Sequence, residues 1–275
     1  MTLASIMVHV DVDAASAERI AVAADLAVRF DAGLIGVAGW PMRKSGGLEQ
    51  SDTEYPPREQ ALQAKVQEQL DALGERFRRS AGENPRGVEW RASYHFPSEF
   101  IAAQARAADL IVVGRDALPG DRYRTFDPGT VIVACGRPVL VVPRGIRRLQ
   151  ASRVLIAWKD TREARRAVRD ALPFLKRAEG VAVAAVGPRD LEEAAREQIG
   201  DVARYLDHHR VAVGRQIAAA ADEAESHVLL RIAEEEKADL IVAGAYGRSR
   251  LSEWIFGGVT RQLLTTSKVP CLFSN

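Results

Sequence analysis

Four glycines and a threonine near the C-terminus have the types and the spacing of a phosphate-binding loop. Gly244 and Gly247 directly follow an apolar run, and Gly257 comes after nine further residues. Glycine has no Cβ atom, so the backbone at these positions can turn tightly and come close to a ligand. The segment continues into Gly258 and Thr260, where we predict the start of a helix whose first N–H groups point outward and suit an anion. This combination favours phosphate or nucleotide binding.

Two cations and a hydroxyl group would strengthen such a site. The predicted helix runs from Val259 to Thr266, and Thr260 in its first turn adds a hydroxyl donor. Arg248 lies inside the glycine segment, and Lys159 follows an apolar run that we predict to be a strand of the same half. Each feature also has an ordinary interpretation, because a glycine pair after a strand can serve only the turn. In the same way, Lys159 can be a solvated loop residue.

The apolar run that precedes the glycines occurs twice. Residues 238–244 are Ala-Asp-Leu-Ile-Val-Ala-Gly, and residues 108–114 are Ala-Asp-Leu-Ile-Val-Val-Gly. A repeat 130 positions apart indicates that one fold is present in two copies. We expect a first domain over residues 1–146 and a second over residues 150–275, joined by a short basic linker at residues 144–152.

The first copy lacks the glycine pattern after the shared run. Gly114 is followed by Asp116, Pro119 and Asp121, and residues 127–130 are Asp-Pro-Gly-Thr. These acidic residues would repel phosphate more than they would hold it. We therefore expect a degenerate site in the first copy, with binding confined to the second.

Apolar runs and helical periodicity alternate along both copies. Nearly continuous apolar strands between helices are typical of a parallel sheet that is covered on both faces. The predicted fold class is α/β, with two tandem, doubly wound, parallel five-stranded sheets. The predicted strands are residues 6–10, 34–38, 88–94, 110–113 and 138–142, then 153–158, 181–186, 211–218, 240–243 and 269–273. The predicted helices are residues 16–30, 59–80, 97–107, 163–176, 191–209, 227–237 and 259–266, and residues 41–57 are predicted to be a loop.

Composition indicates an ordinary globular protein. The 275 residues are 47% apolar and 27% charged, with a formal net charge of +1, which gives no electrostatic case for nucleic acid or an anionic membrane. Residues 1–12 carry His9 and Asp11 and no basic start, so we predict a buried strand rather than a signal peptide. No apolar run approaches the roughly 18 residues of a membrane span. Cys135 and Cys271 are expected to be free thiols of a cytoplasmic protein.

This arrangement resembles the universal stress protein family, and the resemblance covers essentially the whole chain as two tandem copies. It implies an adenine nucleotide alpha hydrolase-like, Rossmann-like fold that binds ATP or another adenine nucleotide, with or without Mg²⁺. In the family, the motif Gly-x2-Gly-x9-Gly-[Ser/Thr] holds the phosphates, and a hydrophobic residue that ends the second strand lines the nucleoside pocket. The corresponding residues here are Val186 for the pocket wall and Ala243, Gly244, Gly247, Gly257, Val259 and Thr260 for the loop.

Two positions depart from the family pattern. Lys159 stands where the family has an Asp that contacts the nucleoside, and Gly258 occupies the Ser/Thr position. Loss of that carboxylate weakens adenosine recognition, whereas a lysine favours another anionic ligand. In the first copy, Asp11 either matches the family's Asp or caps the first helix.

Other reaction classes find little support. His208 and His209 are adjacent and do not share a helix face, so they make a poor metal site. No Ser-His-Asp set or carboxylate pair stands out at a strand end, and a slow ATPase would lack an evident general base.

Residues 254–256, Trp-Ile-Phe, either pack on the sheet edge or form a lid or partner contact. The expected function is nucleotide or phosphate binding by a stress-response protein, and the alternative is an interaction scaffold that has lost binding.

The final strand of each copy indicates how the two copies pack together. Residues 138–142 and 270–273 are short and apolar, and an unpaired apolar edge invites association. Pairing these two strands within one chain would cover both edges and give a pseudo-symmetric protomer. We expect any homodimer to use another surface.

Overall fold

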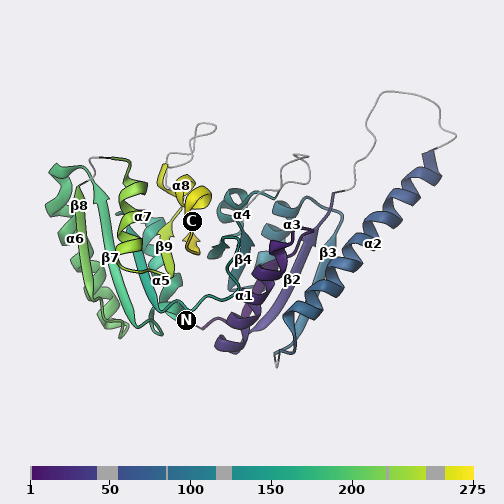
Figure 1. Ribbon diagram of the computed structural model, residues 1–275, viewed down its shortest axis with the longest axis horizontal. Coiled ribbons are helices and arrows are strands. Elements are labelled where there is room, and N and C mark those ends of the chain that lie inside the picture. Colours follow the sequence, from purple (N-terminus) through teal and green to yellow (C-terminus); the bar gives the residue numbers. More distant parts are fainter. Residues whose placement is uncertain (1, 42–54, 85, 116–125, 221–222, 246–257) are drawn as a thin grey trace.

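The computed structural model describes residues 2–41, 55–84, 86–115, 126–220, 223–245 and 258–275 (Figure 1). Ten strands in these residues form one sheet in the order β3-β2-β1-β4-β5-β10-β9-β6-β7-β8. The strands of the first half are β1 (Ser5–His9), β2 (Gly33–Gly39), β3 (Val88–Ser93), β4 (Leu110–Gly114) and β5 (Val139–Val142). Those of the second half are β6 (Arg153–Trp158), β7 (Gly180–Gly187), β8 (Arg215–Ala220), β9 (Leu240–Gly244) and β10 (Cys271–Ser274).

The two halves repeat one topology and share a central seam. Neighbouring strands within each half are parallel, whereas β5 and β10 pair antiparallel, with Leu140 opposite Leu272. The predicted α/β class is confirmed, as is the internal pairing of the two final strands. Because each half places its last strand at this seam, β3 and β8 are the edges of the sheet.

Helices cover both faces of the sheet (Figure 1). One face carries α1 (Ala15–Phe30), α2 (Tyr55–Ala81), α5 (Arg162–Leu175) and α6 (Glu192–His208), whose apolar side chains join one core cluster. The other face carries α3 (Pro97–Gln104), α4 (Pro128–Ala134), α7 (Glu225–Glu235) and α8 (Gly258–Thr266), which pack in a second cluster. Short 3-10 turns follow α3 at Ala105–Ala107 and precede α6 at Arg189–Leu191.

The aspartate of the repeated run ties two strands together in each half. The Asp109 carboxylate accepts hydrogen bonds from the backbone N–H of Ala4 (2.8 Å) and Ser5 (3.1 Å). Asp239 accepts the equivalent bonds from Ser152 (2.9 Å) and Arg153 (2.8 Å). A carboxylate thus satisfies the N–H groups where the central strand begins. These bonds also show which positions of the two halves correspond.

The structure corrects several predicted boundaries. β8 begins at Arg215 rather than at residue 211, because the Val211 N–H bonds to the Leu206 carbonyl and so closes the end of α6. α7 ends at Glu235, since Lys237 adopts a left-handed φ of 52°. The predicted loop over 41–57 is wrong at its end, because α2 begins at Tyr55.

One helix was missing from the predicted set. α4 has the ordinary signature of a helix start, with Asp127 as its N-cap and Pro128 in its first turn. Its seven residues are too few for the helical period to stand out among the apolar residues around it.

Contacts near the seam hold the halves together. Arg29 on α1 donates to the Gln150 carbonyl of the connecting segment at 2.8 Å. The rings of Phe30 and Phe174 meet edge to face with centroids 5.2 Å apart, and the Arg177 guanidinium lies 4.5 Å above the Phe30 ring. The connecting segment is therefore bonded to α1, and α1 also contacts the second half directly.

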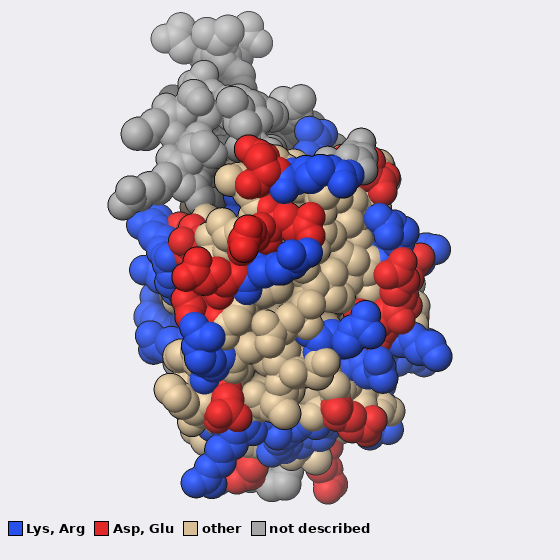
Figure 2. Space-filling model, turned by 90° about the vertical axis from the view of Figure 1, so that its left-hand side faces the viewer, with Lys and Arg blue, Asp and Glu red and all other residues tan. Residues whose placement is uncertain are grey.

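Cys135 and Cys271 are free thiols, as predicted. Burial raises the pKa of Cys271 to about 12, so its sulfur stays protonated and acts as a small apolar group. The surface mixes charges of both signs, as Figure 2 shows for the end of the molecule that carries α6 and β8.

Candidate functional site

The carboxyl ends of β6, β7 and β9 meet at one edge of the second half. β6 pairs with β7 on one side and with β9 on the other. This is the place where strand order reverses, and doubly wound sheets bind ligands there. Lys159 follows β6, Val186 lies near the end of β7, and Ala243 and Gly244 end β9. The structure thus brings these four predicted residues to one edge, while Gly247, Arg248 and Gly257 lie outside the described residues.

Among the residues that the structure describes, the start of α8 is exposed at Gly258 and carries no acidic side chain in its first turn. Gly258 is exposed, and a Cβ atom built on it would meet nothing within 4 Å. Val259 is half-buried, Thr260 is buried, and the first turn of α8 contains no acidic side chain. The first N–H groups of a helix have no partner within the helix and carry its positive dipole end. This helix start can therefore receive an anion.

Gly244 has a packing role that the sequence did not indicate. A Cβ atom at this position would lie 2.4 Å from the backbone nitrogen of Ala164 and 2.7 Å from the carbonyl carbon of Glu163. The missing side chain thus lets the first turn of α5 come close to β9. The nearby Thr161 caps that turn, with its hydroxyl accepting from the Ala164 N–H at 3.2 Å. Gly244 therefore serves the helix–strand contact, whatever else it does.

Lys159 extends toward the start of α7. Its side chain is 77% exposed, and its ammonium lies 3.9 Å from the Glu225 carboxylate. An exposed pair at this distance contributes little stability, so Lys159 can turn toward a ligand at small cost. Val186 is half-buried against the second core cluster. Glu225 is a neighbour that the sequence did not reveal, because it lies 66 positions from Lys159 along the chain.

The two halves can be compared position by position. Asp11 lies seven residues after Ala4, and Lys159 lies seven residues after Ser152. Since Ala4 and Ser152 donate to equivalent aspartates, Asp11 and Lys159 occupy equivalent places. The internal repeat thus places Lys159 at the position that Asp11 has in the first half.

In the first half, Asp11 is already engaged. Its carboxylate lies 2.9 Å from the Arg19 guanidinium and 3.6 Å from Nδ1 of His9, and it does not cap α1. Burial would raise the pKa of Asp11, but Arg19 and His9 hold it below its usual value. Arg19 is itself buried, and it fills the space beside Gly114, where a Cβ atom would lie 2.2 Å from its Nη1.

A carboxylate of the protein occupies the start of α4. Asp127 accepts hydrogen bonds from the N–H groups of Gly129 (3.2 Å) and Thr130 (2.8 Å). Just before it, Phe126 is buried, and its ring lies against that of His9, tilted by 31° with centroids 4.4 Å apart. We expected the acid at 127 to repel phosphate, and the structure gives it a further role as the cap of this helix.

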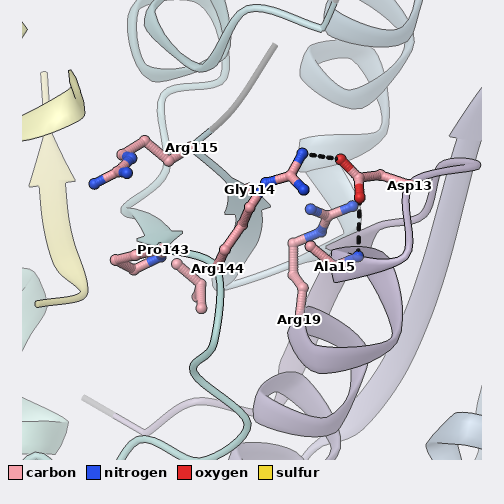
Figure 3. A pocket seen from close by; sticks show the side chains of 8 residues that line it. Asp13, Ala15, Arg19, Gly114, Arg115, Pro143 and Arg144 are labelled. Atoms are coloured by element: carbon pink, nitrogen blue, oxygen red, sulfur yellow. Dashed lines mark hydrogen bonds and ion pairs between the residues drawn. The ribbon is translucent and has the colours of Figure 1, made fainter. Parts of the chain in front are cut away.

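Arginines that the sequence did not single out gather at the same end of the first half. Figure 3 shows Arg19, Arg115 and Arg144 around a small cavity beside Gly114. Arg144 pairs with Asp13, and Arg115 donates to the Ser267 carbonyl of the other half. The cavity has a volume of about 10 Å³, which is room for about one water molecule. It cannot take a nucleotide as it stands.

Comparison with known proteins agrees with the fold. Residues 151–274 match the model of the Universal stress protein family. A universal stress protein from Archaeoglobus fulgidus DSM 4304 is 15% identical and has a TM-score of 0.69, over 98% of this chain and 98% of that one. A putative universal stress protein from Pseudomonas aeruginosa UCBPP-PA14 is 17% identical with a TM-score of 0.55, over 99% of this chain and 93% of that one.

No curated protein matches the chain. At identities this low the two structural likenesses establish the fold over the full length, and the family match covers the second half. The second half of this chain is therefore a universal stress protein domain, and the chain as a whole has the fold of two such domains in tandem.

Proposed function

We propose that this chain is a cytoplasmic stress-response protein that binds an ATP-type nucleotide or another phosphate ligand in its second half, over residues 150–275. The observation that carries the proposal is the contrast between two helix starts. Neither helix has an acid in its first turn, but the N-cap of α4 is Asp127, whose carboxylate accepts from the N–H groups of Gly129 and Thr130, whereas α8 begins at the exposed Gly258. The first domain, over residues 1–146, would then hold a degenerate site.

The positive charge near the second site favours binding of a ligand's phosphate groups more than binding of its sugar. The first half has a carboxylate at Asp11, and the second half has the exposed ammonium of Lys159 in its place. A lysine donates to phosphate but cannot accept from ribose hydroxyls. We therefore expect the affinity to depend on phosphate number, with ATP above ADP and ADP above AMP.

The alternative is a scaffold that has lost nucleotide binding. The same replacement by Lys159 favours it, because the carboxylate acceptor that the family places there is absent. The two carboxylates that follow β6 most closely in the chain are both in ion pairs, Asp160 with Arg165 and Glu163 with Arg162. We therefore propose binding without appreciable hydrolysis under either alternative.

The first experiment identifies what the protein carries. Native mass spectrometry of the purified chain should show one bound nucleotide or phosphate compound, or accept one when ATP, ADP, AMP or pyrophosphate is added. Calorimetric titration then ranks these ligands, and released phosphate is measured in parallel. Absence of binding for all four compounds would favour the scaffold, and steady release of phosphate from ATP would make the protein an enzyme.

A further inference from the structure

A groove opens on the second half between α5 and α6, on the sheet face opposite α8. Its volume is about 510 Å³, within the range of small-molecule sites. Trp158 at the end of β6 forms part of its lining, together with Val168 on α5 and Val202 and Tyr205 on α6. The first three belong to the core cluster of that face, and Tyr205 is 39% exposed. The floor of the groove is therefore apolar, and its rim is open to solvent.

In the first half, large apolar side chains fill the space on the same face of the sheet. There α2 sends Leu70, Leu73 and Phe77 into the same core cluster as Ile20 of α1. Phe77 is fully buried against β2, where a Cβ atom on Gly36 would lie 2.7 Å from its ring. The ring that α6 contributes, Tyr205, lies exposed at the rim, and the buried residues of α6 are the aliphatic Ile199, Val202 and Leu206. The smaller side chains leave the space that the groove occupies.

One arginine at the rim, Arg169, forms no ion pair in the described part of the chain, although its charge acts on the Asp170 carboxylate. Asp160 forms an ion pair with Arg165, and Asp201 forms one with Arg204. Arg169, on the same side of α5 as Val168, has no hydrogen-bond or ion-pair partner among the described residues. An anionic group of a ligand could therefore bind Arg169 without first breaking an ion pair.

Trp158 offers the groove an apolar surface. Its side chain is only 9% exposed, and its Nε1, which has no hydrogen-bond partner in the described part of the chain, is closed off from solvent. The accessible part of this indole is therefore ring carbon, which suits the apolar rings of a ligand.

We propose that this groove is a second ligand site, separate from the start of α8, which takes one planar apolar molecule bearing a single anionic group. The rings would lie over Trp158 and between Val168 and Val202, and the anion would face Arg169. The class is that of aromatic carboxylates and sulfonates. The proposal does not depend on nucleotide binding, because the groove and α8 lie on opposite faces of the sheet.

The test uses two dyes that differ only in the anion. The first is 1-anilinonaphthalene-8-sulfonate, and the second is N-phenyl-1-naphthylamine, which has the same rings without the sulfonate. Fluorescence titration of the full chain should show one site for each dye. Arg169→Gln should weaken the sulfonate about tenfold, as expected for loss of one charge-assisted contact, and should leave the neutral dye unchanged. Arg169→Lys should retain most of the affinity.

Two controls make the result specific. Arg196→Gln removes an exposed arginine of α6 that does not line the groove and should change neither titration. Gln198→Trp fills the groove from its half-buried rim and should remove both dyes, with circular dichroism confirming the fold. Saturating ATP should displace neither dye. The proposal is overturned by absence of sulfonate binding, by equal losses in the two Arg→Gln variants, by binding that survives Gln198→Trp in the folded protein, or by displacement with ATP.

Discussion

His9 makes a pH-dependent contribution to stability whose size follows from the structure. The imidazole is buried at the end of β1, and burial lowers its pKa from 6.5 to about 4, although Asp11 opposes the change. A folded pKa below the unfolded one means that the unfolded chain binds more protons between these two values. Stability is therefore fully present above pH 6.5 and is lost as the pH falls toward 4. At 1.36 kcal/mol per pKa unit, the separation of the two pKa values corresponds to roughly 3 kcal/mol.

The assay is urea unfolding of the unmodified chain and of His9→Leu at pH 7, 5.5 and 4. The leucine variant should lose roughly 3 kcal/mol less than the unmodified chain between pH 7 and pH 4. His227→Gln is the matched control, because that imidazole is 55% exposed, and it should follow the unmodified chain. The carboxyl of Asp11 titrates below this window, since its pKa is lowered from 3.8. Equal losses in the unmodified chain and His9→Leu, or a His9 NMR titration centred near pH 6.5, would refute the reasoning.

Four further tests, one of which compares two glycine substitutions, examine particular positions. Asp127→Ala should cost about 1 kcal/mol of unfolding free energy through loss of the α4 cap, and no change in the urea midpoint would contradict that role. Gly244→Ala should cost about 1–3 kcal/mol, because its methyl group meets the backbone of α5, whereas Gly258→Ala should stay within about 0.5 kcal/mol; similar costs for both would count against the packing role. Leu140→Glu buries a charge at the seam and should cost about 3–5 kcal/mol, with small-angle scattering showing looser halves; an unchanged profile would argue against the seam. Lys159→Asp should weaken ATP binding in calorimetry, because it replaces the ammonium that we propose to face phosphate with a carboxylate, whereas stronger binding would show that residue 159 meets the nucleoside instead.

Much of the fold could be predicted because it depends on local patterns. The repeated Ala-Asp-Leu-Ile-Val run specifies both a buried strand and the aspartate that binds the start of the neighbouring central strand. The pairing of the two last strands also follows from their apolar, short sequences, since each would otherwise be an open edge. Boundaries were less secure where a turn residue decides them, as at Arg210, whose left-handed φ of 61° ends α6 before β8 begins.

The site was harder to predict because its geometry depends on contacts distant in the sequence. Gly244 follows a strand as a phosphate-loop glycine does, yet its missing side chain also accommodates α5, 80 residues earlier. Arg19 is one arginine on an amphipathic helix, and only the fold shows that it lies beside Gly114 and binds Asp11. The groove above Trp158 depends on the spacing between two helices, which no local pattern encodes.

The most direct test of the central claim is calorimetric titration of ATP into the unmodified chain and into Gly258→Asp. The new carboxylate would lie at the start of α8 in open space, where the helix dipole tolerates it, so the variant should fold normally while its charge excludes phosphate. We predict one site per chain in the unmodified protein and at least about a hundredfold weaker binding in the variant, which corresponds to nearly 3 kcal/mol. Two sites per chain, or unchanged affinity in a folded Gly258→Asp protein, would contradict the claim that the ligand binds at the start of α8.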